Sequence, residues 1–299
     1  MKKKRFTQMA AVGVVGSALV LLLAGAAMAG TKPQAPAVPA DPYRAVKVTP
    51  ASAIAAVRAM VERPLPQNGA ANVAARAQVA EVQTSDLKAN APIDGKVFRF
   101  YDVEGADVSA AVDAHDGHVA QLLVMSRIPK VRTDATINDQ QALDIASSYL
   151  VDQGIAVDGM TAQVKLDDRG AALVYSVSWQ RSVNGALVPD SRLVQLDAGT
   201  GVIFNVHNIS RPYSDPPTAV VARDQAISVA QDTATKSVGR KSATYKLIDA
   251  SLQVTFDSQG TQGLVWQVKL YAADLANSTG YFEVTVDAMT GSASVTGRG

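Results

Sequence analysis

The apolar and polar positions of this chain repeat three times in one order, a helical pattern followed by strand patterns, with a period of about 85 residues. In the second copy, apolar residues at helical spacing cover residues 142–150, and in the third the motif Gln225-Ala226-Ile227 repeats Gln141-Ala142-Leu143. In the first copy the apolar stripe covers residues 53–61. Each copy is therefore predicted to begin with one amphipathic helix.

Two of these helices carry start signals. Thr49 is a candidate N-cap directly before Pro50, a residue that suits the first helical position. Thr136 and Asp139 have the spacing of a capping box ahead of the second helix. The sequence therefore predicts that the first helix begins at Pro50 and that Thr136 caps the second.

Three kinds of strand pattern follow each helix. The first alternates apolar and polar residues, as expected for a sheet with one buried and one solvated face, the second is rich in aromatic residues, and the third leaves a shared turn. The first kind covers residues 77–82, 161–166 and 251–256, the second 97–103, 173–179 and 264–270, and the third 119–124, 202–206 and 293–295. We expect an antiparallel meander in each copy, covered by its helix.

The shared turn has the sequence Asp-Ala-x-x-Gly, at residues 113–117, 197–201 and 287–291. Aspartate at the first turn position accepts hydrogen bonds from backbone N–H groups further round the turn, and glycine supplies the positive φ of a type I turn with a bulge. Each pentapeptide is therefore predicted to be a β-hairpin tip. Asn184-Gly185 predicts a further hairpin with a type I′ turn.

These patterns predict an α+β protein made of tandem small domains, each a helix packed on an antiparallel β-sheet. The expected units are residues 49–130, a diverged first copy, then 134–210 and 218–299. The joins contain Pro129, Pro212, Pro216 and Pro217, and proline ends sheets.

The N-terminal region has a different character. Residues 1–29 combine a basic start, an apolar run and the pattern Ala27-Met28-Ala29, which predicts a secretory signal peptide cleaved after Ala29. An uncleaved N-terminal anchor is the alternative, because the apolar run has about the length that spans a bilayer. Residues 30–48 are rich in Pro and Ala and predict a linker. With either leader, the remaining chain is expected to be secreted or extracytoplasmic, in the cell envelope.

Charge and cysteine content exclude several functions. The leader holds four of the 28 basic residues and none of the 27 acidic ones, so the remainder has 24 basic against 27 acidic residues and a net charge of −3. Such a mildly acidic chain has no electrostatic footprint for nucleic acid or anionic lipid. The absence of cysteine excludes disulfides, thiolate metal sites and cysteine nucleophiles.

Three histidines are the first candidates for chemistry. His115 and His118 bracket Asp116, with Asp113 nearby, so a metal site of nitrogen and carboxylate ligands is conceivable. Turn geometry accounts for Asp113, however, and a hairpin tip is expected to be too exposed to hold an ion in place. His207 ends a strand and has no nucleophile motif to accompany it.

The remaining candidates also have structural interpretations. The pair Asp167-Asp168 precedes Arg169-Gly170, a turn sequence, and lacks the spacing of a calcium loop. Trp179 and Trp266 are expected to pack in the core, with an exposed aromatic recognition surface as the alternative. We therefore predict no catalytic, cofactor-binding or metal-binding residue, and no enzyme activity.

The second and third copies resemble the PepSY superfamily, which includes the PepSY and FTP modules of thermolysin-type protease propeptides and the YcdB/YcdC-type repeats. The residues that carry the resemblance are Gln141-Ala142-Leu143 and its counterpart at 225–227, the aromatic strands at 175–179 and 265–268, the hairpin Val183-Asn184-Gly185, and the closing 286–291. In the first copy the resemblance rests on the shared turn and on the order of elements.

The resemblance implies a cystatin-like helix-on-sheet fold and a noncatalytic role without cofactors. It implies binding or modulation of a secreted peptidase or cell-wall hydrolase, here in trans because no protease domain follows the third copy. An envelope spacer or scaffold without a peptidase partner is the alternative. Oligomeric state has no signal in the sequence.

Overall fold

The computed structural model describes residues 42–62, 86–94, 98–239, 243–257, 259–272 and 280–298. The predicted leader, residues 30–41 of the predicted linker and the predicted strand at 77–82 lie outside the described residues. Among the helices that are described, none combines the length and the apolar character needed to cross a membrane.

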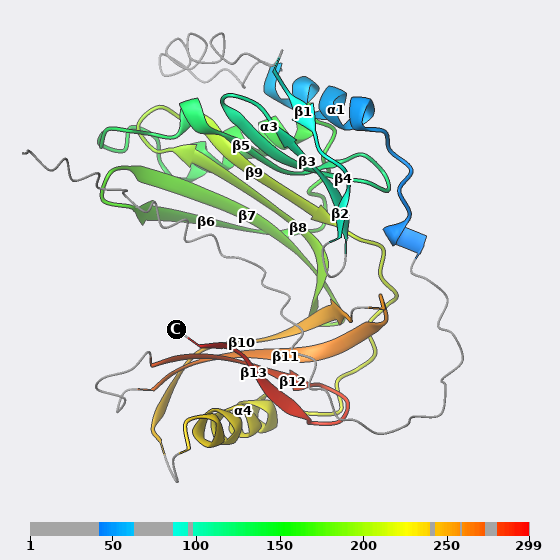
Figure 1. The fold of residues 1–299 in the computed structure, drawn as a ribbon. Helices are drawn as coiled ribbons and strands as arrows, with labels where there is room; N and C mark the ends of the chain where they lie inside the picture. The colour runs from blue at the N-terminus through cyan, green and yellow to red at the C-terminus, as the bar shows by residue number, and fades with distance from the viewer. Residues whose placement is uncertain are drawn as a thin grey trace, which may run out of the picture.

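Three α-helices and thirteen strands make up the described fold, labelled as in Figure 1. The helices are α1 (Pro50–Glu62), α3 (Asp139–Asp152) and α4 (Arg223–Ser237), with short 3₁₀ turns η1 (Pro42–Arg44) and η2 (Met125–Arg127). The strands are β1 (Lys88–Ala89), β2 (Ile93–Asp94), β3 (Arg99–Glu104), β4 (Val108–Asp113), β5 (Val119–Val124), β6 (Thr161–Asp168), β7 (Leu173–Val183), β8 (Ala186–Asp197), β9 (Ile203–Ser210), β10 (Tyr245–Phe256), β11 (Gln262–Ala272), β12 (Tyr281–Asp287) and β13 (Ala293–Arg298). Every predicted strand within the described residues overlaps an observed one, and the α+β class is confirmed.

All thirteen strands belong to one hydrogen-bonded sheet with the main order β1-β3-β4-β5-β9-β8-β10-β11-β12-β13, while β7 pairs β8 and β6 pairs β7. The sheet continues across both predicted joins. Strand β5 pairs antiparallel with β9, and β10 pairs parallel with β8 through the single register pair Gln253 and Leu187. Three separate sheets are therefore not present, and the domain boundaries stay predictions.

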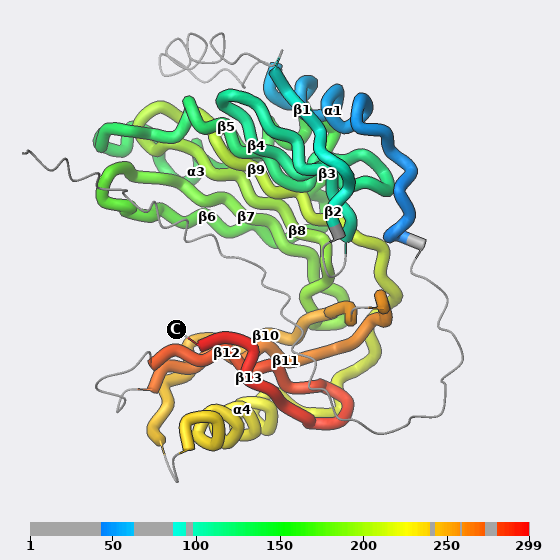
Figure 2. Tube along the Cα trace, in the orientation of Figure 1, coloured from blue at the N-terminus to red at the C-terminus, as the bar shows by residue number. Residues whose placement is uncertain are grey.

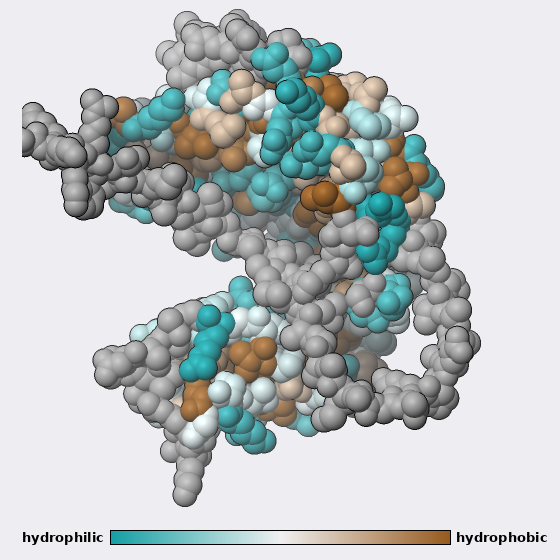
Figure 3. Space-filling view, viewed as in Figure 1, coloured by the Kyte–Doolittle hydropathy of each residue, from teal (hydrophilic) through white to brown (hydrophobic). Residues whose placement is uncertain are grey.

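The sheet curls so that its two halves face each other. Figures 1 and 2 show β3 to β9 above and β10 to β13 below, with α1 over the upper half and α4 under the lower half. The space-filling view shows the opening between the halves as a hollow in the molecular surface (Figure 3). Strand β8 is the connection, because its first residues adjoin β10 while its later residues pair with β7 and β9.

The helices bury their apolar stripes against one face of the sheet. Residues of α1 and α3, among them Val57 and Ile145, share one core cluster with Val177 and Leu196 of the sheet. The first two copies therefore have a common core. Helix α4 instead contributes Ala226, Ala230 and Ala234 to a second cluster with β11 and β12.

The shared pentapeptide forms the predicted turn in all three copies. Oδ1 of Asp197 accepts hydrogen bonds from the backbone N–H of Gly199 at 2.8 Å and of Thr200 at 2.7 Å, and the other two aspartates accept corresponding pairs. The closing glycines have φ values of 84°, 71° and 77° at Gly117, Gly201 and Gly291. The backbone reason for aspartate and glycine is confirmed.

The alanine of the pentapeptide has a separate role. Its carbonyl accepts two backbone N–H groups from the segment that enters the helix of the same copy, at Ala114 from Lys47 and Val48, and likewise at Ala198 and Ala288. These three alanines are 0% exposed. The pentapeptide therefore anchors the start of each helix to the sheet, and only a small side chain fits beneath that crossing.

The helix starts agree with the sequence in one of two cases. Thr49 Oγ1 accepts a hydrogen bond from Ser52 N at 3.2 Å ahead of Pro50, as predicted. The predicted cap at Thr136 is wrong, since a capping box forms between Asn138 and Gln141, with both hydrogen bonds at 2.9 Å. Thr136 instead donates through Oγ1 to Gly199 O at 2.6 Å, because the segment before α3 lies against the turn.

Candidate functional site

The face of the upper half that carries no helix presents a row of polar side chains. In strand order these are Asp167 of β6, Ser176 of β7, Gln195 of β8, and Asn205 and His207 of β9. We call this set the polar row. Its members lie opposite one another because Ser176 is in register with Gln195, and Gln195 with Asn205.

Hydrogen bonds connect the polar row across four strands. Ser176 Oγ donates to Asp167 Oδ2 at 3.2 Å and accepts from Gln195 Nε2 at 3.1 Å. Asn205 Nδ2 lies 2.9 Å from Gln195 Oε1 and 3.2 Å from His207 Nε2. The five side chains are thus joined to one another within the sheet, which restrains them, while Asn205 Oδ1 is buried without a hydrogen-bond partner.

The polar row contains a hydroxyl, a carboxylate and an imidazole, but it does not assemble them as a nucleophile and its base. Ser176 and His207 are separated by two strand spacings, about 10 Å, with two amide side chains between them. A general base must lie within hydrogen-bond reach of the group it activates. The row therefore suits recognition of a polar ligand better than acyl transfer.

Burial lowers the pKa of His207, so its imidazole is neutral in the folded protein near neutral pH. The unfolded chain has the ordinary histidine pKa of about 6.5 and takes up a proton first as the pH falls. The free energy of unfolding is therefore expected to decrease from about pH 7.5 to about pH 5.5, and His207→Gln should remove part of that decrease. Urea unfolding of both proteins at the two pH values measures it, and equal pH dependence would contradict the prediction.

Strand β6 forms a free edge of the sheet beside the polar row. It pairs with β7 over all eight of its residues without a register shift, and no other described strand pairs with it. At the two ends of the main strand order, β13 has six residues and an irregularity in its pairing with β12, and β1 has two residues. Of β1, β6 and β13, β6 therefore has the longest regular edge.

The charged side chains of β6 are held by neighbours. Lys165 Nζ lies 2.6 Å from Asp167 Oδ1, and Asp168 accepts two hydrogen bonds from the guanidinium of Arg132, at 2.7 and 2.9 Å. This pairing lowers the pKa of Asp168 and raises that of Arg132. Leu166 is 43% exposed and lies on the face of the strand opposite to Lys165 and Asp167. The edge thus offers backbone groups, a partly exposed leucine and neutralised charges.

The lower half presents a polar face of the same kind. Thr285 Oγ1 donates to Gln267 Oε1 at 2.9 Å and lies 3.3 Å from Thr296 Oγ1. These residues come from β12, β11 and β13, on the side of the sheet opposite the α4 cluster. Both halves therefore turn hydroxyl and amide groups away from their helices.

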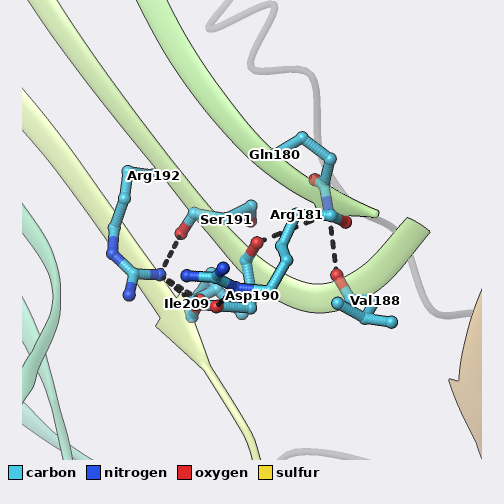
Figure 4. A network of polar contacts seen from close by, with 7 residues as sticks. All are labelled: Gln180, Arg181, Val188, Asp190, Ser191, Arg192 and Ile209. Atoms are coloured by element: carbon cyan, nitrogen blue, oxygen red, sulfur yellow. Dashed lines mark hydrogen bonds and ion pairs between the residues drawn. The ribbon is translucent and has the colours of Figure 1, made fainter. Parts of the chain in front are cut away.

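A network of charged residues lies where the halves meet (Figure 4). Asp190 of β8 pairs with Arg192 at 2.7 Å and with Arg181 of β7. Arg192 also donates to Ile209 O at 2.8 Å, and Gln180 Nε2 donates to Val188 O at 2.7 Å. Asp190 and Arg192 are buried, so this network fixes the course of β8 towards β10.

Arg211 packs between rings from the two halves. Its Cζ lies 3.8 Å from the ring centroid of Phe256 and 5.5 Å from that of Phe98. Neither Arg211 nor the Asp190 network was predicted. Counting outward from the two-residue turn at 184–185 predicts that Arg181 lies opposite Val188. A register shift between Gln180 and Ser182 changes this pairing.

The structure locates each residue that the sequence analysis singled out as a candidate. Trp179 is 4% exposed in the common core, and Trp266 is half-buried with Nε1 donating to Val221 O at 2.8 Å, so the core interpretation holds for both. Asp168 Oδ1 accepts from Gly170 N, as the turn interpretation requires. His207 belongs to the polar row, whereas the group around His118 lies apart at the turn after β4.

The turn at 113–117 is more buried at Asp113 than the sequence led us to expect. Asp113 is only 1% exposed, because residues 43–48 cross over the turn, and Lys47 and Val48 donate to Ala114 O. Tyr43 Oη donates to Asp116 Oδ2 at 2.8 Å, and its ring stacks on His115 with a centroid distance of 4.5 Å. The expectation of an exposed tip at Asp113 is therefore wrong.

No protein-family model and no curated protein match this chain. Among solved structures it is similar to a chain described as the Bacillus megaterium YpeB C-terminal domain, with a TM-score of 0.37 and 12% sequence identity. That similarity covers 79% of this chain and 100% of the other.

Proposed function

We propose that this protein is a noncatalytic, extracytoplasmic PepSY-like binding protein that acts in trans on a secreted peptidase or cell-wall hydrolase. In this proposal each of the three copies is a helix-on-sheet unit of the PepSY type, tethered behind its leader and linker. The motifs at 141–143, 183–185 and 286–291 support the PepSY assignment, and the Pro-rich segment supports the tether.

The observation that carries the proposed binding role is the free edge of β6. A strand edge presents unpaired N–H and C=O groups that an extended peptide can pair with, and proteins commonly prevent this with bulges, prolines or charges. β6 has eight residues in unbroken register and no proline, and its Lys165 is already paired to Asp167. These features leave the edge open to strand addition.

The proposed occupant is an extended segment of the partner protein that continues the sheet beyond β6. Its apolar side chains would alternate with polar ones, because one face of the added strand would meet Val164 and Leu166 and the other would meet Gln163 and Lys165. Backbone hydrogen bonds would supply affinity, and the alternating side chains would supply selectivity.

Proline substitutions at Gln163 and Val164 test this binding mode. Backbone N–H groups of neighbouring residues point to opposite edges of a strand, so one proline removes a hydrogen bond to β7 and the other removes only an outward N–H. Urea unfolding identifies the outward position as the one with the smaller loss of stability. That variant is expected to fold and to lose at least about tenfold in partner affinity.

The partner is sought by capture from the culture or envelope fraction of the producing organism, followed by peptidase and wall-hydrolase assays. The proposal is supported if wild type recovers such an enzyme and changes its activity, while the outward proline variant does neither. Recovery of no peptidase or hydrolase, together with unchanged secreted proteolysis, would falsify it.

One observation favours the alternative, an envelope spacer or scaffold. Both tryptophans pack in the core, so neither supplies an exposed aromatic anchor of the kind that dominates many interfaces. A spacer would tolerate both proline variants without any change in binding or proteolysis. The same capture experiment therefore separates the two functions.

A further inference from the structure

The turn at 113–117 shares its backbone with the other two turns but carries different side chains. At its fourth position the other copies have Thr200 and Thr290, and Thr200 Oγ1 donates to Asp197 Oδ1 at 3.0 Å. In the first copy this position is Asp116, so a second carboxylate replaces a hydrogen-bond donor. Two carboxylates side by side repel each other unless a cation or a proton lies between them.

Asp113 has an unsatisfied oxygen in this turn. Its Oδ1 accepts from His115 N at 2.7 Å and from Asp116 N at 3.3 Å, whereas its Oδ2 is buried and has no hydrogen-bond partner. Burial also raises the pKa of the Asp113 carboxyl. A buried carboxylate oxygen without a partner is costly, and a bound cation would remove that cost.

Asp116 and His118 complete the group. One potential ligand atom from each of Asp113, Asp116 and His118 lies within 4.8 Å of the others. His118 Nδ1 contacts Asp116 Oδ1 at 2.6 Å. Burial alone would raise the pKa of Asp116, but the hydrogen bonds from His118 and Tyr43 lower it well below its usual range. Asp116 is therefore an anion near neutral pH.

The group is open on one side. The side chains of Asp116 and His118 are 42% and 20% exposed, so an ion can reach them from solvent and water can fill a remaining coordination position. Ligand atoms around one ion at about 2.1 Å lie about 3.4 Å apart in tetrahedral geometry. A pair of ligand atoms at the 4.8 Å limit would therefore need to close by about 1.4 Å, whereas His118 Nδ1 and Asp116 Oδ1, which are 2.6 Å apart, would need to separate by about 0.8 Å. The carboxylate of Asp116 and the imidazole of His118 are partly exposed, so both side chains have room to rotate.

We propose that Asp113, Asp116 and His118 bind a divalent first-row transition-metal ion, with Zn²⁺ the expected ion. Imidazole together with carboxylates suits Zn²⁺, whereas Ca²⁺ and Mg²⁺ prefer oxygen ligands alone. Without a thiolate, the affinity should be moderate. His115 is not a ligand in this proposal, because its ring stacks on Tyr43 and its Nε2 lies 3.1 Å from Lys47 Nζ.

The test is calorimetric titration of the tag-free, full-length protein with ZnCl₂ and, separately, with CaCl₂. We expect one Zn²⁺ per chain, little or no response to Ca²⁺, and dissociation constants at least about tenfold weaker in Asp116→Asn and His118→Ala. His115→Ala is the matched control from the same turn and should bind within about twofold of wild type. X-ray absorption at the zinc edge should show nitrogen and oxygen ligands.

Several results would overturn the site. These are a dissociation constant for Zn²⁺ weaker than about 1 mM, tighter binding of Ca²⁺ than of Zn²⁺, or an equal loss in His115→Ala and His118→Ala. Folding of each variant is checked by thermal unfolding without metal. Because a bound ion stabilises the native state, Zn²⁺ should also raise the Tm of wild type and of His115→Ala but not of the other two variants.

Discussion

Asp190→Asn is expected to lower the free energy of unfolding by about 3 kcal/mol, because it leaves two arginines without their shared counter-ion. Arg192 and Arg181 both pair with Asp190, and the three side chains are 9%, 27% and 13% exposed in that order. Nε of Arg192 is already buried without a hydrogen-bond partner, and the other acceptors of its guanidinium, the carbonyl oxygens of Ser191 and Ile209, carry no charge that could replace the carboxylate. Urea unfolding at neutral pH measures the change.

A matched control comes from an exposed ion pair of similar geometry. Arg132 and Asp168 form two hydrogen bonds at 2.7 and 2.9 Å, but their side chains are 48% and 55% exposed. Asp168→Asn should leave the free energy of unfolding unchanged within error, since water solvates the arginine that remains. Equal effects of the two substitutions would mean that the Asp190 network is as well solvated as the exposed pair of Arg132 and Asp168.

Phe282→Ala is expected to cost about 4 kcal/mol in the free energy of unfolding. Phe282 is 0% exposed, and its ring meets that of Tyr245 edge to face at 5.8 Å. The buried α4 residues of this core are the alanines 226, 230 and 234, which cannot extend into a cavity, while Ile227 and Val229 of α4 pack against it only partly buried. Most of the cavity left by the lost ring is therefore expected to remain unfilled.

Two further variants make the Phe282 result specific. Phe282→Leu keeps most of the buried volume and should cost less than half as much as the alanine variant. Tyr271→Ala removes an aromatic ring that is 49% exposed on the adjacent strand, and should change stability by no more than about 0.5 kcal/mol. A cost at Phe282→Ala as small as at Tyr271→Ala would show that the lower core repacks freely.

For much of the candidate site, the sequence predicted the strands but not how the strands lie beside one another. Alternation at 161–166 predicted β6, and the observed strand extends to Asp168. Its position at the edge depends instead on which strands lie beside it, and among the described strands β6 pairs with β7 alone. The polar row likewise requires the registers of β7, β8 and β9, which residue patterns within single strands do not contain.

The turn at 113–117 shows the same division. The sequence predicted the hydrogen bonds of Asp113 and the positive φ of Gly117, since both arise within five residues. It did not predict the burial of Asp113, because the covering residues 43–48 are about 70 positions away and reach the turn through α1 and the sheet.

The sequence by itself determined the three helices, the strands other than β1 and β2, and the three turns, because helical periodicity, alternation and turn chemistry act between residues close in the chain. Only the tertiary structure decided that the three copies share one sheet, joined between β5 and β9 and between β8 and β10. It also decided that β6 is an edge and that Arg211 lies between two aromatic rings. These features depend on contacts between distant segments, whose free energy comes from packing and from register across the whole sheet.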